Sequence, residues 1–237
     1  MSEPLQFSLF DTLAPTEAES PPPTPLDAAT YDQIPLRAEV PIPTGTYRDL
    51  EALAAHCQQC QRCGLAATRT HVVVSRGNPA AKLMIIGEGP GQAEDETGRP
   101  FVGKAGQLLD KILASVNLDS ERDAYICNIV KCRPPGNRVP EPAETAACLP
   151  YLLEQIRLVN PRIILLAGAT AVSGLLKDNR GITKIRGQWI EWQGRWCMPI
   201  FHPAYLLRNN SRAPGSPKWL TWQDMQAVRD RLRQLDP

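Results

Sequence analysis

Three short apolar segments, separated by stretches with helical hydrophobic spacing, constrain the fold of this 237-residue chain more than any other feature. The apolar segments are residues 82–87, 124–130 and 161–168, and the last is apolar almost throughout, as a strand covered on both faces should be. Helical spacing is found at 103–116, 142–159, 169–176 and 217–235, and Thr46 is placed to cap an earlier helix. Residues 182–201 alternate and predict a hairpin that turns at Gln193 and Gly194. Strands alternating with helices predict an α/β sandwich with a mainly parallel sheet.

The loops after the predicted strands indicate where a ligand would bind. In parallel sheets, ligands sit beyond the carboxyl ends of the strands, which selects loops 87–103, 128–141 and 201–213. The glycines of the first loop allow a close approach of backbone to ligand. Its carboxylates, and the lack of a Gly-Lys-Ser/Thr sequence, argue against a nucleotide-binding P-loop. Phe101 is placed to form the wall of a flat pocket.

The charge of the chain is divided unevenly along its length. Residues 1–46 carry a net charge of −6 and are rich in proline, whereas the remainder carries +7. The first part is typical of a disordered tail, and 47–237 is the predicted folded domain. A basic body is compatible with a nucleic-acid partner or with an ordinary solvated surface, and charge alone does not separate these interpretations.

Seven cysteines in a chain without a secretory signal or a membrane-spanning apolar run predict metal or redox chemistry in the reducing cytoplasm. Cys57, Cys60 and Cys63 form a C-x-x-C-x-x-C run, and Cys132 and Cys148 fall in predicted loop and helix positions. The spacing leaves open an iron–sulfur cluster or a zinc ion, and two or three ligands from the run. We interpret the two remaining cysteines, which lie in predicted strands, as buried hydrophobic residues: Cys127 and Cys197.

Four separated blocks, GEGPGQAED, GRPFVGKAG, NIVKCRPPGNR and HPAYLLRN, together resemble the signature of the family 4 uracil-DNA glycosylases. These are iron–sulfur enzymes of bacteria and archaea. The resemblance runs from the cysteine run to the closing helix and implies a three-layer α/β/α sandwich around a mainly parallel, four-stranded sheet. It also implies an enzyme that flips uracil out of DNA, hydrolyses its N-glycosidic bond and leaves an abasic site for base excision repair.

The resemblance assigns roles to the residues of the pocket. His202 is expected to hydrogen-bond the uracil O2 as negative charge develops, and Asn128 to read the uracil edge. Phe101 is the expected stacking aromatic. Backbone amides at Gly89 and near Gln92 would complete the pocket.

Two carboxylates of the first loop are also expected to act in the site. We expect Glu88 to orient water or stabilise the cationic sugar, and Glu94 to fill the space beside uracil C5 and exclude the methyl group of thymine. The two roles are open to partial exchange, and the alternative for both residues is an acidic, solvated loop.

The block after His202 predicts contacts with DNA. Leu206 and Leu207 are candidates for an apolar wedge that enters the gap left by a flipped base, and Arg208 for holding a flanking phosphate. The alternative is that the leucines pack in the core at the start of a helix.

The resemblance selects four of the cysteines as ligands of a [4Fe-4S] cluster: Cys60, Cys63, Cys132 and Cys148. Cys57 is then an extra thiol, and a structural zinc ion is the alternative occupant. The block 128–142 contains no histidine and no basic insert, which disfavours a relative that becomes covalently trapped on DNA. A non-catalytic iron–sulfur DNA-binding subunit would lack the pocket set Phe101, Asn128 and His202.

The pentapeptide at residues 6–10, QFSLF, resembles the motif by which bacterial DNA-processing proteins bind the sliding clamp. Gln6, Leu9 and Phe10 would fill the pockets of the clamp, and the tail would supply reach. Phe7 departs from the usual leucine. We expect the enzyme itself to be a monomer.

Overall fold

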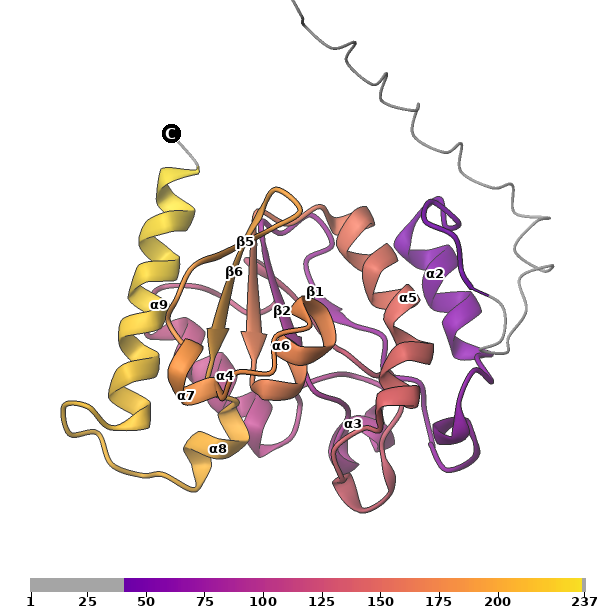
Figure 1. Ribbon diagram of the computed structural model, residues 1–237, viewed down its shortest axis with the longest axis horizontal. Coiled ribbons are helices and arrows are strands. Elements are labelled where there is room, and N and C mark those ends of the chain that lie inside the picture. The colour runs from indigo at the N-terminus through magenta and orange to yellow at the C-terminus, as the bar shows by residue number, and fades with distance from the viewer. Residues whose placement is uncertain (1–40, 236–237) are drawn as a thin grey trace, which may run out of the picture.

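The computed structural model describes residues 41–235, which form a twisted sheet with helices on both faces (Figure 1). The sheet has six strands in the order β1 (Arg76–Gly77), β3 (Ala124–Asn128), β2 (Leu83–Gly87), β4 (Ile163–Ala167), β6 (Arg195–Ile200) and β5 (Ile190–Trp192). The four central strands run parallel, and the two short edge strands pair antiparallel. The predicted α/β class and mainly parallel sheet are confirmed, and the edge strands raise the strand number from the four expected to six.

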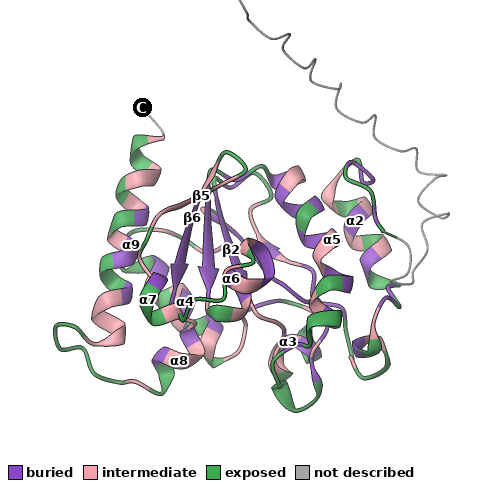
Figure 2. Cartoon of the chain, in the orientation of Figure 1, coloured by how far each residue is buried: buried purple, intermediate pink, exposed green. Residues whose placement is uncertain are grey.

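Side chains of the central strands alternate between two hydrophobic cores, which makes the molecule three-layered. Along β2, Met84 and Ile86 pack into one core, whereas Leu83 and Ile85 pack into the other. The first core lies under α2 (Leu50–Gln58), α5 (Pro142–Val159) and α6 (Ala169–Leu176). The second lies under α4 (Lys104–Ala114) and α9 (Pro217–Gln234). The strands are therefore buried on both faces (Figure 2), as their apolar sequences predict.

Shorter elements occupy the loops at the carboxyl edge of the sheet and beside it. They are η1 (Gly64–Ala67), α3 (Gln92–Thr97), η2 (Pro135–Asn137), α7 (Ile182–Ile185) and α8 (Pro203–Leu207). Within residues 41–235, no helix is long and apolar enough to cross a bilayer.

The hairpin predicted over 182–201 is confirmed only in its second half. Its first four residues form the helical turn α7, and strand pairing begins only at Ile190. The turn itself is confirmed, because Gln193 and Gly194 have φ values of 48° and 71°. Positive φ at both central residues is the hallmark of a turn that matches strand twist.

The first helix begins later in the sequence than predicted, whereas the first residues buried in the folded domain come earlier than the predicted domain boundary. Asp49, and not Thr46, caps α2 by accepting a hydrogen bond of 2.7 Å from the backbone N–H of Ala52. Ile42 and Thr46 are already buried, and the N–H of Gly45 donates to a carboxylate on α5. Part of the segment assigned to the tail therefore packs on the folded body. The predicted clamp motif at 6–10 lies outside the described residues.

Candidate active site

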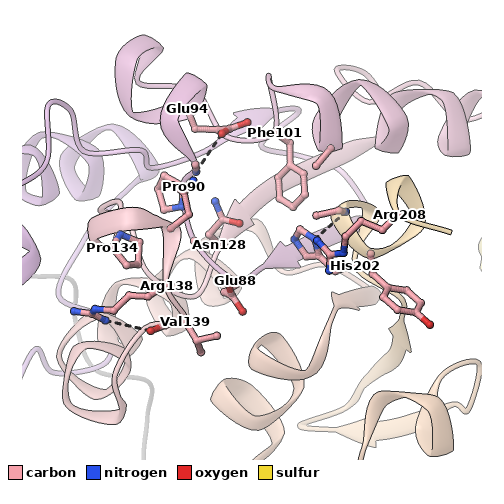
Figure 3. Close-up of a pocket in the computed structure, with 16 residues that line it drawn as sticks. Glu88, Pro90, Glu94, Phe101, Asn128, Pro134, Arg138, Val139, His202 and Arg208 are labelled. Carbon is pink, nitrogen blue, oxygen red and sulfur yellow. Dashed lines mark hydrogen bonds between the residues drawn. The ribbon is translucent and has the colours of Figure 1, made fainter.

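A cavity of about 570 Å³ opens at the carboxyl ends of β2, β3 and β6. Figure 3 shows its lining, which all three predicted loops supply. The predicted site residues that line it are Glu88, Gly89, Glu94, Phe101, Asn128, His202 and Arg208. Residues from segments more than 100 positions apart in sequence thus meet in one place, as the parallel topology requires.

Asn128 lies at the bottom of the cavity with an unused acceptor. It ends β3 opposite Gly87, and only 2% of its surface is exposed. Within the described chain its Oδ1 atom has no hydrogen-bond partner. A Cβ on Gly87 would approach this oxygen to 2.4 Å and the Phe101 ring to 2.5 Å, so a glycine is needed here. A buried unpaired acceptor costs free energy, which indicates that a ligand is meant to donate to it.

Phe101 faces the cavity from a strained backbone. Its φ of 55° is rare for a bulky residue. A Cβ on Gly106 would overlap the Phe101 carbonyl at 1.7 Å, so α4 approaches the loop as closely as glycine allows. The ring centroids of Phe101 and His202 are 5.9 Å apart, which places both rings on the same wall.

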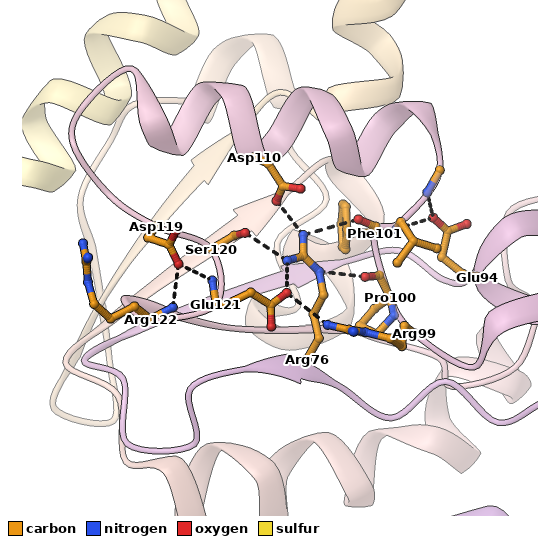
Figure 4. Close-up of polar contacts among 12 residues, drawn as sticks. Arg76, Glu94, Arg99, Pro100, Phe101, Asp110, Asp119, Ser120, Glu121 and Arg122 are labelled. Carbon is orange, nitrogen blue, oxygen red and sulfur yellow. Dashed lines mark hydrogen bonds and ion pairs between the residues drawn. The ribbon is translucent and has the colours of Figure 1, made fainter.

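Arg76 holds that strained loop in place (Figure 4). Its guanidinium donates to the carbonyls of Pro100 at 2.9 Å and Phe101 at 3.3 Å, and to Asp110 at 2.6 Å. It also contacts Ser120 and Glu121 at 3.0 and 2.8 Å. These five contacts match the five N–H donors of the guanidinium, and the side chain of Arg76 is only 4% exposed. Sequence reasoning missed this residue, because it lies in none of the motif blocks.

His202 is held as a neutral donor. Its Nδ1 accepts a hydrogen bond of 3.1 Å from the N–H of Ala204 at the start of α8. Burial, together with the charge of Arg208, lowers the pKa of His202 to about 4, although Glu94 acts in the opposite direction. At neutral pH the ring is therefore uncharged and carries its proton on Nε2, which leaves that nitrogen as a donor.

The two predicted carboxylates have different surroundings. Glu88 accepts a hydrogen bond of 2.5 Å from the hydroxyl of Thr170 at the start of α6. Glu94 accepts three backbone N–H groups: those of Val102 and Gly103 at 2.9 and 2.8 Å, and that of Gly91 at 3.1 Å. Glu94 thereby ties the two halves of loop 87–103 together and is fixed in position.

Three predicted site residues do not line the cavity. Gln92 is exposed and donates to Glu96 on the same helix at 2.8 Å. Leu206 is only 1% exposed, so its prediction as a wedge is wrong, because α8 turns this side chain toward the body. Leu207 is 39% exposed, so of the two leucines it is the one that stays a candidate for the wedge.

The five cysteines outside the strands line a second, smaller cavity. Cys57, Cys60, Cys63, Cys132 and Cys148 share it with Arg62, Arg69, Lys131 and three apolar residues. No disulfide joins the cysteines described. Among residues 41–235, no group of three or more His, Cys, Asp or Glu side chains is arranged to hold a metal ion. Cys127 and Cys197 are fully buried in strands, in keeping with their prediction as hydrophobic residues.

Donors surround the thiols. The backbone N–H of Lys131 lies 3.3 Å from the Cys148 sulfur, that of Arg62 lies 3.5 Å from Cys60, and Arg69 lies 3.5 Å from Cys132. Burial raises the pKa of Cys148 to about 12 and that of Cys132 to about 11. These thiols are protonated at neutral pH unless a metal takes the place of the proton. The N–H donors and cations are suited to sulfur that carries negative charge.

Comparison with known proteins identifies the family. The model of the uracil DNA glycosylase superfamily matches residues 74–226. A type-4 uracil-DNA glycosylase of Thermotoga maritima is 49% identical over 164 residues, which cover 68% of this chain and 85% of that protein. The type-4 enzyme of Saccharolobus solfataricus is 40% identical over 169 residues, covering 68% of this chain and 78% of its own. That of Sulfurisphaera tokodaii is 41% identical over 169 residues, with 68% and 76% covered. The chain belongs to the uracil-DNA glycosylase superfamily and, within it, to the type-4 uracil-DNA glycosylases.

Proposed function

We propose that this protein is a uracil-DNA glycosylase, which flips uracil out of DNA and hydrolyses its N-glycosidic bond to leave an abasic site. The observation that carries the proposal is the unpartnered, buried Oδ1 of Asn128 in a cavity that also holds Phe101 and a neutral His202. The family membership supports the same reaction. A non-catalytic relative is not favoured, because it would have no need of these three side chains in one cavity.

Recognition of uracil uses the amide of Asn128. Its Oδ1 accepts from uracil N3–H and its Nδ2 donates to O4, whereas cytosine presents the opposite pattern. The base stacks on Phe101, which its strained loop holds in place. Glu94 stands beside C5, where a carboxylate fixed by three N–H groups makes a rigid wall against the methyl of thymine.

The reaction requires stabilisation of negative charge that moves onto the departing base. His202 donates from Nε2 to uracil O2, and a neutral donor avoids proton transfer before the bond breaks. Glu88 orients the attacking water or stabilises the cationic sugar, with its carboxylate held by Thr170. Arg208 holds a phosphate beside the flipped nucleotide, and Leu207 fills the gap in the base stack.

The chemistry of the cysteine cavity, rather than a preformed ligand geometry, supports a [4Fe-4S] cluster held by Cys60, Cys63, Cys132 and Cys148. Four thiols from three segments line one cavity, and N–H donors and three cationic side chains offset the charge of thiolates. The cluster would supply a covalent tie between the end of α2, the loop after β3 and α5. Cys57 is the fifth thiol and is not assigned as a ligand.

The test of the function is incubation of the purified protein with a uracil-containing oligonucleotide, followed by alkali. Strand cleavage at the uracil is expected, and its absence would overturn the proposal. Iron analysis and absorbance at ~400 nm test the cluster, and a colourless protein containing zinc would contradict it.

We further propose a location, an oligomeric state and a protein partner for this enzyme. The enzyme acts as a cytoplasmic monomer, and Gln6, Leu9 and Phe10 bind a sliding clamp. A clamp pull-down with the Leu9→Ala, Phe10→Ala double variant tests the motif. Equal capture of the variant and the original protein would contradict it.

A further inference from the structure

A second groove of about 390 Å³ lies beside the active-site cavity, between α4, α9 and the chain that follows α8. Its floor is apolar and aromatic, with Ile112, Trp219 and Trp222 among its lining residues. Trp222 is 46% exposed and shares the groove with the second tryptophan, so its ring is available for stacking.

The rim of the groove is positively charged. Lys111 comes from α4, Lys218 from the first turn of α9, and Arg212 from the intervening chain. No carboxylate lines the groove among the described residues. An aromatic floor with a cationic rim is the combination that binds single-stranded nucleic acid, since bases stack on the rings and phosphates pair with the cations.

The groove and the active-site cavity are both lined by residues of α8. The short helix α8 contributes Tyr205 to the active-site cavity and Leu206 to the groove. The next residue, Leu207, is exposed, and Arg208 after it lines the active-site cavity. A helix with its side chains is about 10 Å across, which is about three nucleotide steps along a stacked strand. A strand whose uracil occupies the cavity therefore reaches the groove with a nucleotide a few positions away.

We propose that this groove binds an unpaired nucleotide flanking the uracil, with its base stacked on Trp222 and its phosphates held by Lys111, Arg212 and Lys218. This inference rests on the proposed function. Because the groove would add a subsite, the enzyme should bind single strands that extend well past the uracil more tightly than strands that end close to it.

The experiment measures single-turnover excision on two single-stranded oligonucleotides. One carries about ten nucleotides on each side of the uracil and the other carries one. Trp222→Ala is expected to raise the enzyme concentration giving the half-maximal rate about tenfold on the long strand. It should leave the trimmed strand and both maximal rates unchanged. Trp222→Phe, which keeps a ring for stacking, should restore most of the affinity.

The matched control is Leu153→Ala, which removes an exposed apolar side chain from α5 on the other side of the sheet. It should change neither substrate. A second variant, Lys218→Gln, should weaken binding of the long strand and reduce the slope of affinity against salt concentration by about one. Thermal unfolding of each variant shows that the fold is kept.

Equal behaviour of Trp222→Ala and the original protein on both strands would overturn the subsite and leave the groove to a protein partner. An equal loss on both strands would also overturn it, because the effect would then not depend on flanking nucleotides. If the original protein excises no uracil, the proposed function fails. Anisotropy of labelled, uracil-free single strands then tests the groove alone, and identical binding by Trp222→Ala would overturn it.

Discussion

The active-site cavity and the cysteine cavity are both lined by the loop after β3, and their residues are held in place by different means. Glu94, His202 and Phe101 in the first are positioned by hydrogen bonds within the chain. The second places five cysteines around a small space without a disulfide. The first is thus arranged by the polypeptide alone, whereas we propose that the second depends on a cluster.

Lys131 connects the two cavities. It is only 1% exposed, its Nζ donates to the Asn128 carbonyl at 2.6 Å, and its N–H points at the Cys148 sulfur. Changes in the cysteine cavity should therefore reach the base-reading residue through this lysine. The comparison predicts that variants of the first cavity alter chemistry, and that variants of the second alter stability first.

The largest expected effect is on the rate of excision in His202→Ala. Loss of a donor aimed at the developing charge should slow the single-turnover rate by about 10²–10³-fold. The thermal midpoint should fall by only a few degrees, because the structural loss is mainly the hydrogen bond that caps α8, worth about 1 kcal/mol. His71→Ala is the control, since His71 lies outside the cavity; a similar rate loss there would argue against the assignment of His202.

Cys148→Ser is expected to act mainly on stability. Loss of a ligand should remove the absorbance at ~400 nm and lower the thermal midpoint by roughly 10 °C. Cys57→Ser should keep the absorbance, because Cys57 is not assigned as a ligand. Loss of absorbance in Cys57→Ser with retention in Cys63→Ser would show that the ligand register is wrong.

Arg76→Ala should have an intermediate effect on both properties. Removal of the guanidinium frees the Pro100 and Phe101 carbonyls and should cost ~2 kcal/mol of unfolding free energy. Because Phe101 then loses its support, the affinity for substrate should fall more than the maximal rate. Arg99→Ala, at an exposed ion pair with Glu121, is the control and should change neither quantity appreciably. A stable Arg76→Ala enzyme with unaltered affinity would refute the positioning role.

The effect that is smallest at neutral pH is the pH dependence of stability, which develops only in acid. The pKa of His202 is about 4 in the folded protein, below its ordinary value near 6.5, so the unfolded chain binds more protons between these values. The contribution of His202 to stability is therefore present above about pH 6.5 and is lost as the pH falls toward 4. Urea unfolding at several pH values should show a smaller decline for His202→Ala, and equal declines would contradict the lowered pKa.

The sequence predicted the central architecture because buried parallel strands leave a strong apolar signal, as in β2 and β4. It did not reveal β1, which is two residues long and is defined by its pairing with β3. The helical turn at Ile182–Ile185 was mistaken for a strand, since a short apolar run has no clear period.

The candidate site, like the fold, was predicted only in part from the sequence. Motif blocks identified Asn128, Phe101 and His202, which do meet in one cavity. They did not identify Thr170 or Arg76, because each acts on a residue distant in sequence and neither lies in a block. Burial also separated Leu206 from Leu207, which the sequence could not do.

The proposed function depends most on the buried Oδ1 of Asn128, which is left unpartnered by the described chain and is proposed to read uracil. The most direct measurement is of excision rate and unfolding free energy together in Asn128→Ala. We predict a rate lower by about 10²–10³-fold with a free energy of unfolding that is unchanged or higher, because the variant removes an unsatisfied buried acceptor. An active variant, or an inactive one that is severely destabilised, would contradict the account.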